Sequence, residues 1–176
     1  MTSEEIIEKI KSELAGDILS AETPLGDAVV HLEPSALPKA CEFIKNDPEL
    51  DFDYLTNISG VDYLDMDREP RFEAVYEFHS IDKNHSLRLR VGIEEESPSV
   101  PTISHLWKSA GFPERELFDM FGIDVAGHPD LRRLIMPDDW EGHPLRRDYS
   151  LTTEDIAFSF NRDYKSELVK KKPQTR

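Results

Sequence analysis

The sequence contains one cysteine, no long apolar run and no glycine-rich loop, and each absence excludes a class of protein. Cys41 has no second cysteine to pair with, so the chain forms no internal disulfide and no cysteine-ligated zinc or iron–sulfur cluster. No run approaches the roughly 20 apolar residues that span a bilayer. The N-terminus lacks the basic start and apolar stretch of a signal peptide. We therefore expect a cytosolic protein that reaches a membrane only through partner proteins.

Phosphate-binding loops and basic surfaces are also missing. The 8 glycines are scattered and form neither GxGxxG nor GxxxxGKS/T. Any dinucleotide is therefore expected to bind to another chain. Lys and Arg number 21 against 36 Asp and Glu, and the net charge is −15. Nucleic acids are bound by basic surfaces that neutralise phosphates, so this acidic chain is expected to bind neither nucleic acid nor anionic lipid.

The acidic charge is concentrated in the first two thirds of the chain. Residues 1–125 contain 11 Lys and Arg against 27 Asp and Glu, whereas residues 126–176 contain 10 against 9. A chain of 176 residues fits one domain with an appendage. We predict a folded domain over 1–125 and an extended docking tail over 126–176.

The apolar spacing in the first part predicts a two-layer α+β domain. Helical periodicity is present over 2–14, 35–46 and 103–110, and short alternating or β-branched runs predict strands over 28–32, 52–58, 72–78 and 87–93. Thr2 and Glu5 form a capping box for the first helix, and Ser35 is expected to cap the second. The last two strands carry glutamates on one and arginines on the other, which favours an antiparallel hairpin.

The stretch from residue 114 to residue 149 is the densest in specific residue types. It reads ERELFDMFGIDVAGHPDLRRLIMPDDWEGHPLRRDY. Pro113 suits the first position of a helix, and Gly122 can take the left-handed conformation that ends one. Beyond Gly122 three prolines prevent a long helix, and a short strand is expected only around Leu134 and Ile135. Such an extended segment cannot form its own core, so it is expected to lie on another surface.

Several of these residues could carry chemistry. His128, Asp130, Asp138, Asp139 and His143 are acceptable metal ligands, but prolines separate them and the HExxH spacing is absent, so caps, turns and interface bonds are the favoured roles.

Acid–base catalysis by Glu114, Glu116 or Asp119 and nucleophilic catalysis by Cys41 are also disfavoured. Glu114 and Glu116 suit a helix start, and Arg115 with Asp119 has the spacing of an ion pair. Cys41 lies on the apolar face of a predicted helix, where buried cysteines are usually inert.

The arginine pairs and aromatic side chains of the tail indicate docking. Arginine forms bidentate bonds to carboxylates and is enriched at interfaces, as are tryptophan and tyrosine. The tail holds two Arg-Arg pairs and five aromatic residues, which are Trp140, Tyr149, Phe158, Phe160 and Tyr164. We expect these aromatic side chains to be covered rather than exposed on a loose tail.

The segments ERELFDMFGI, GHPDLRRLIMPDDW and GHPLRRDY resemble the signature of one protein family. It is the thirty-kilodalton-type (C) subunit of respiratory complex I, the proton-pumping NADH:quinone oxidoreductase. These segments cover about a fifth of the chain. One departure is Phe112, where the family usually has tryptophan before the proline.

The resemblance implies a mixed, largely antiparallel sheet with helices on one side. It also implies a non-catalytic subunit without a cofactor of its own, peripheral on the cytoplasmic face of the membrane. FMN, iron–sulfur clusters and quinone are then expected on partners, which are the quinone-site (forty-nine-kilodalton-type) subunit and the iron–sulfur subunits.

We predict that the subunit interface is built from the charged and aromatic residues of the signature. They are Glu114, Arg115, Glu116, Asp119, His128, Arg132, Arg133, Trp140, Arg146, Arg147, Asp148 and Tyr149. Two alternatives stay open. One is the equivalent subunit of a membrane-bound hydrogenase or of a quinone oxidoreductase with another electron donor. The other is a stand-alone enzyme that uses the His/Asp cluster with a metal.

Overall fold

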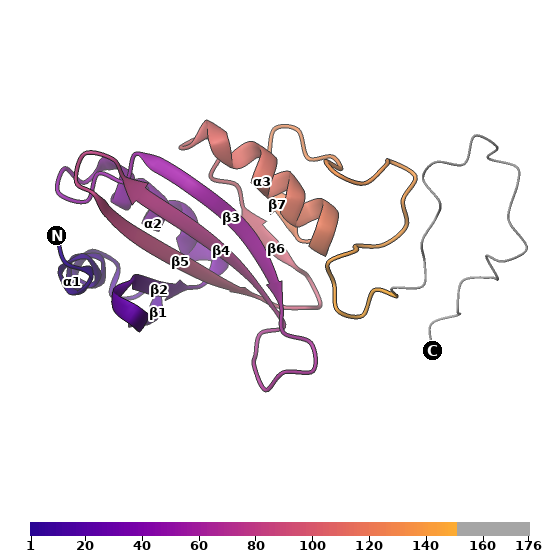
Figure 1. The fold of residues 1–176 in the computed structure, drawn as a ribbon, viewed down its shortest axis with the longest axis horizontal. Helices are drawn as coiled ribbons and strands as arrows, with labels where there is room; N and C mark the ends of the chain where they lie inside the picture. Colours follow the sequence, from indigo (N-terminus) through magenta and orange to yellow (C-terminus); the bar gives the residue numbers. More distant parts are fainter. Residues whose placement is uncertain (151–176) are drawn as a thin grey trace, which may run out of the picture.

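A five-stranded sheet forms the framework of the molecule (Figure 1), and the computed structural model describes it within residues 1–150. The strands run in the order β1-β2-β5-β4-β3. Only β2 and β5 are parallel, and the other neighbours are antiparallel. The bounds are Ile18–Glu22 for β1, Ala28–Leu32 for β2, Tyr54–Asp62 for β3, Phe72–Ser80 for β4 and His85–Ile93 for β5. The predicted α+β class with a mixed, largely antiparallel sheet is confirmed.

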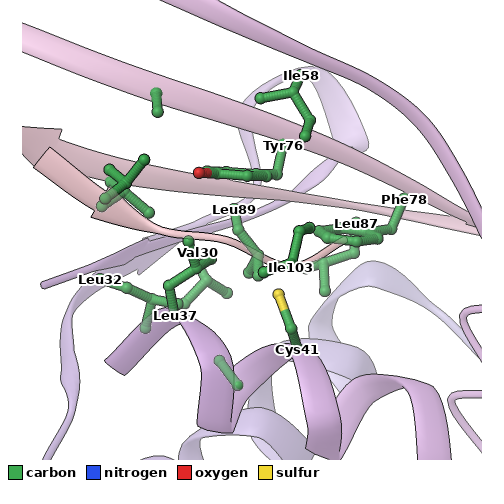
Figure 2. Packing of buried hydrophobic residues seen from close by; sticks show 14 of the residues in the cluster. Val30, Leu32, Leu37, Cys41, Ile58, Tyr76, Phe78, Leu87, Leu89 and Ile103 are labelled. Atoms are coloured by element: carbon green, nitrogen blue, oxygen red, sulfur yellow. The ribbon is translucent and has the colours of Figure 1, made fainter. Parts of the chain in front are cut away.

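The helices pack on one face of this sheet. They are α1 (Ser3–Leu14), α2 (Leu37–Asn46) and α3 (Gly111–Glu116). Apolar residues of α1 and α2, together with Leu117, Met120 and Phe121 directly after α3, join the inward residues of the strands in one cluster. Figure 2 shows Cys41 directed from α2 toward the sheet, below Leu89. Burial raises the pKa of the Cys41 thiol, with the nearby Glu114 carboxylate adding to the effect. Cys41 is therefore an inert part of the core, as expected.

The two predicted helix caps had different outcomes. Thr2 and Glu5 do form a capping box at α1. The predicted cap at Ser35 is wrong, because Ser35 lies inside a 3₁₀ turn (Pro34–Ala36) and α2 begins after Ala36 without a side-chain cap. The fixed φ of Pro38 at the start of α2 favours the helical conformation there instead.

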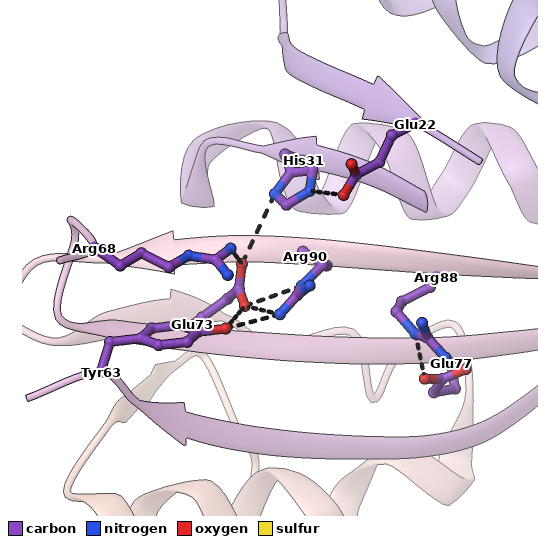
Figure 3. A network of polar contacts seen from close by, with 8 residues as sticks. All are labelled: Glu22, His31, Tyr63, Arg68, Glu73, Glu77, Arg88 and Arg90. Atoms are coloured by element: carbon purple, nitrogen blue, oxygen red, sulfur yellow. Dashed lines mark hydrogen bonds and ion pairs between the residues drawn. The ribbon is translucent and has the colours of Figure 1, made fainter. Parts of the chain in front are cut away.

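The opposite face of the sheet carries a network of polar side chains instead of a second layer of helices. Glu77 lies directly across the hairpin from Arg88, and their side chains form an ion pair of 2.6 Å. Figure 3 shows Glu73 at the centre of the remaining contacts, accepting hydrogen bonds from Tyr63, Arg68 and Arg90. The predicted hairpin and its charge pairing are confirmed.

The chain between the hairpin and the signature differs from its prediction. No helix covers 103–110; a turn and a 3₁₀ segment (Lys108–Ala110) occupy this stretch, and Gly111 begins α3. The buried carboxylate of Glu114 accepts the backbone N–H of Ile103 and the hydroxyl of Thr102, and these bonds hold the turn. Ser99–Pro101 (β6) pairs in parallel with Asp124–Ala126 (β7) in a second small sheet, which the sequence did not predict.

Gly60 sets the distance between β3 and the helical layer. The strand predicted over 52–58 instead continues through this glycine to Asp62. A Cβ atom at position 60 would lie only 2.6 Å from the ring of Phe121, so glycine is required for this close approach. Within residues 1–150, no helix has the length and apolarity needed to cross a bilayer.

We predict that Gly60→Ala destabilises the fold by about 1–3 kcal/mol, because the added methyl displaces the buried ring of Phe121. Gly16→Ala is the matched control, since a Cβ there meets nothing within 4 Å. Denaturant unfolding of both variants measures the difference. Equal free energies of unfolding for the two variants would contradict the proposed packing of Phe121 on β3.

Candidate functional site

The described end of the signature, residues 127–150, returns to the domain and lies beside α3 (Figure 1, orange). We call this segment the ribbon. It contains turns and bends but no helix or strand. The predicted strand at Leu134 and Ile135 is wrong, because their backbone N–H groups bond to a side chain rather than to a neighbouring strand. Phe158, Phe160 and Tyr164 lie outside the described residues.

Asp119 holds the centre of the ribbon. Asp119 lies in a π-helical turn, η4 (Leu117–Phe121), and is fully buried. One carboxylate oxygen accepts the N–H groups of Leu134, Ile135 and Met136 at 3.0, 2.7 and 2.9 Å. Burial by itself would raise the pKa of Asp119, but these donors and Arg133 outweigh it and lower the pKa. Consecutive N–H groups on one anion form a nest, which fixes the local backbone.

Arg133 joins this carboxylate to the far part of the ribbon. One guanidinium nitrogen lies 2.7 Å from the other Asp119 oxygen, and the second donates to the carbonyls of Trp140 and Gly142. His143 donates from Nδ1 to the backbone carbonyl of Asp119 at 3.0 Å. These bonds fold the segment between Arg133 and His143 into a closed loop against η4.

Arg115 binds the same loop from α3. Its guanidinium donates to the carbonyls of Arg132 and Arg133 at 3.0 and 2.8 Å. The expected ion pair between Arg115 and Asp119 is therefore wrong. Asp119 takes its cation from Arg133, whose donors reach the buried carboxylate from the ribbon.

Arg146 attaches the next turn of the ribbon. It donates to the carbonyl of Phe121, and its guanidinium carbon lies 5.0 Å from the ring centre of Phe72. Gly122 ends η4 in the left-handed conformation, as predicted, with φ of 69°. A Cβ there would come within 2.6 Å of both His143 and Arg146, so glycine also admits these two side chains.

A second cluster of charged residues holds the end of the ribbon at the C-terminal end of β3. Arg71 makes two 3.0 Å hydrogen bonds to Asp62 and a 2.9 Å ion pair with Asp148, and the N–H of Arg147 donates to Asp62 at 2.8 Å. Burial would raise the pKa of Asp62, but Arg71 and the two backbone donors of Arg147 and Leu64 lower it to about 2. Sequence reasoning missed Asp62 and Arg71, because they lie outside the signature and only the fold brings them to Asp148.

Glu114 and His128 join α3 to the small sheet. Glu114 is fully buried, and its carboxylate lies 3.7 Å from Nε2 of His128. His128 donates from Nε2 to the carbonyl of Gly111 and accepts the N–H of Asp130 at Nδ1. Burial raises the pKa of Glu114 despite the hydrogen bonds that it accepts. Both side chains act within this chain as cross-links.

The other predicted interface residues have looser surroundings. Among residues 1–150, the Arg132 side chain pairs only with Asp130, and both side chains are well exposed. Within residues 1–150, the Glu116 carboxylate and the Arg147 guanidinium form no hydrogen bond or ion pair. The Trp140 indole N–H is buried and has no hydrogen-bond acceptor among residues 1–150. The ring of Tyr149 packs over Gly142.

The histidines and aspartates weighed as metal ligands do not converge. Across the described residues, no three His, Cys, Asp or Glu side chains lie in an arrangement that could hold a metal ion. His128 and His143 bond instead to backbone groups of α3 and η4. What the signature builds in this part of the chain is a clamp, in which buried carboxylates and arginines hold an irregular segment on the domain.

Comparison with known protein families identifies the family of this chain. A family model described as respiratory-chain NADH dehydrogenase, 30 Kd subunit, matches residues 30–155. This match includes most of the sheet and the whole ribbon. The chain belongs to this family.

Relatives in the family are similar over most of their length. A protein of Roseiflexus sp. (strain RS-1), named as the C subunit of an NADH-quinone oxidoreductase, is 46% identical over 158 residues, which is 90% of each chain. A protein of the same name from Geobacter sulfurreducens is 40% identical over 84% of this chain and 89% of its own.

Two solved structures share the fold. A trypsin-resistant fragment of Nqo5 superposes with a TM-score of 0.65 at 35% identity, covering 74% of this chain and 100% of the fragment. A chain of an archaeal membrane-bound sulfane sulfur reductase superposes with a TM-score of 0.69 at 19% identity, covering 84% and 85%. At that identity the second likeness shows the fold alone.

We predict that Asp119→Ala lowers the free energy of unfolding by about 3–5 kcal/mol, because it leaves Arg133 and three backbone N–H groups without their acceptor. Asp130→Ala is the control, since it removes only an exposed pair of at most about 1 kcal/mol. Denaturant unfolding and proteolysis of the ribbon measure both changes. A loss in Asp119→Ala no larger than in the control would show that the clamp does not stabilise the fold.

We also predict that acid releases the ribbon. Unfolded aspartates titrate near about pH 3.9, and the folded pKa values of Asp62 and Asp119 are lower. Their contribution is therefore fully present above about pH 4 and is lost as the pH falls toward the folded pKa of Asp62, about 2. The stability difference between wild type and Asp62→Asn should shrink over this range. A difference that stays constant from about pH 5 to about pH 2 would contradict the assignment.

Proposed function

We propose that this chain is a cofactor-free, non-catalytic subunit of the peripheral arm of a complex-I-type NADH:quinone oxidoreductase. In this proposal it packs through the ribbon against the subunit that shapes the quinone site. FMN, iron–sulfur clusters and quinone are held by partner subunits, and the chain lies on the cytoplasmic face of the membrane through those partners. The names of its relatives, which are C subunits of NADH-quinone oxidoreductases, support this role.

The observation that carries the proposal is the clamp on the ribbon. An irregular segment normally costs conformational entropy when it is ordered at an interface. Here Asp119, Arg133 and Arg146 order it inside the chain, before any partner is bound. A partner therefore meets a preformed surface, and this suits a subunit whose task is to hold neighbours at fixed spacing.

The sequence has neither the cysteine ligands of an iron–sulfur cluster nor a phosphate-binding loop, which agrees with a structural, non-catalytic role. Cys41 is the single cysteine and is fully buried, and the glycines form no phosphate-binding loop. The electron-transfer centres would then lie on neighbouring subunits, and this chain would fix the distance between them.

The charged side chains of the signature that lack a partner among residues 1–150 are the ones that a partner protein can pair with. Among residues 1–150, the Glu116 carboxylate and the Arg147 guanidinium have no partner, and the Arg132 guanidinium has only an exposed one. Glu114, Asp119 and Arg133 are already satisfied inside the chain. We propose that the first group contacts the partner directly and that the second supports it by shaping the ribbon.

One further candidate follows from the fold. The chain of the sulfane sulfur reductase shows that the same architecture occurs in a membrane complex with another substrate. The equivalent subunit of such a complex is therefore the second candidate. Purification of the tagged chain with its partners separates the two, since a flavin-binding NADH subunit among them supports the first.

We predict that Arg147→Glu lowers assembly while leaving the isolated chain as stable as wild type, because its guanidinium has no internal partner in the described part of the chain. Arg146→Glu should lower both assembly and stability, because Arg146 also binds Phe121. Loss of a hydrogen bond made by a charged group costs about 1.5–3 kcal/mol. The measurement is the yield of co-purified subunits from gently solubilised membranes.

Lys83→Glu in the exposed hairpin turn is the control for charge reversal alone. Normal yield from both arginine reversals would overturn the proposed interface. Recovery of the wild-type chain alone, with an activity of its own, would overturn the proposed function.

A further inference from the structure

Besides Leu145, three large apolar side chains of α3 and the ribbon are exposed. The exposed fractions are 65% for Phe112, 58% for Ile135 and 36% for Leu134. Arg115 connects them, because its guanidinium carbon lies 5.8 Å from the centre of the Phe112 ring and its nitrogens bond the carbonyls of Arg132 and Arg133. We call Phe112, Leu134 and Ile135 the apolar edge.

Single exposed apolar residues are common on protein surfaces and do not by themselves indicate a binding site. The apolar edge differs because its backbone is fixed from inside. The N–H groups of Leu134 and Ile135 both bond the buried Asp119 carboxylate, so these residues cannot turn inward without breaking those bonds. Met136, the next residue, bonds the same oxygen and packs partly buried against the core. Of the three successive apolar residues 134–136, Met136 is therefore partly buried, whereas Leu134 and Ile135 are exposed.

We propose that the apolar edge inserts into a mainly apolar pocket on a partner protein, with a carboxylate at its rim that binds Arg132. This inference rests on the proposed function and names the part of the ribbon that makes the energetically dominant contact. Hot spots at interfaces are few and central, lie in well-packed pockets without water, and are surrounded by contacts that exclude water. Arg132 fits the rim, because its side chain is 69% exposed and its one partner, Asp130, is 59% exposed.

The charge of the chain selects a protein as the occupant. A net charge of −15 repels anionic lipid and equally repels a second copy of the same chain. A partner pocket with a carboxylate can still be attracted by the Arg132 guanidinium, because two charges in contact lie within the Debye length of about 8 Å at physiological salt.

The test compares two isoleucines of equal exposure. Ile135→Ser alters the apolar edge, and Ile81→Ser alters the hairpin turn, where the side chain is 61% exposed. Each full-length tagged variant replaces the natural chain in its own cells, and the complex is purified from gently solubilised membranes. We expect Ile135→Ser to lower the molar ratio of co-purified quinone-site subunit by about tenfold, as for a hot-spot residue. Ile81→Ser should match wild type.

Two further measurements make the result specific. Both isolated variants should unfold at the wild-type denaturant midpoint, because neither side chain is in the core. A photoreactive residue at position 135 should cross-link to an apolar segment of a partner subunit. Cross-links to lipid alone, or to a second copy of this chain, would overturn the proposal.

The outcomes separate this inference from the proposed function. If wild type recovers the complex and Ile135→Ser recovers as much of it as Ile81→Ser, the apolar edge is not the contact and the proposed function stands. If wild type recovers no partner subunit, the proposed function fails and this inference fails with it. A tenfold loss confined to Ile135→Ser supports both.

Discussion

The buried carboxylate of Asp119 is the group on which the arrangement of the signature depends. A buried carboxylate is costly unless charges and hydrogen bonds compensate it. Among residues 1–150 all of its donors come from the ribbon, as three successive backbone N–H groups and the Arg133 guanidinium. Asp119 and the ribbon therefore need each other, because the carboxylate can stay buried only while the ribbon covers it.

The π-helical turn makes this arrangement possible. Such turns are rare and occur often at functional sites. Here η4 carries Asp119 and also offers the carbonyls of Asp119 and Phe121 to His143 and Arg146. One short turn thus supplies acceptors to three separate parts of the ribbon. Gly122 closes the turn and leaves the space that His143 and Arg146 occupy.

The clamp and the polar face of the sheet use charge in different ways. On the sheet, Glu73 and Glu77 pair with arginines of the neighbouring strand, so both ion pairs lie within one hairpin. Around the ribbon, buried charges fix the backbone, whereas the Glu116 carboxylate and the Arg147 guanidinium are unpaired among residues 1–150 and the apolar edge is exposed. We regard the first as a stabilised surface and the second as a preformed docking surface.

The sequence alone determined the fold class, α1, β2, the β4–β5 hairpin and the family, because periodicity, capping residues and the signature are local in the chain. Only the tertiary structure decided the partners of the charged residues. Asp119 pairs with Arg133 rather than with Arg115, and Arg71 of the hairpin binds Asp148 of the ribbon. The physical reason is that a buried charge takes the donor that the fold brings to it, and spacing along one helix does not reveal a donor far away in sequence. The same reason explains the false helix over 103–110, where Glu114 captures the backbone N–H of Ile103.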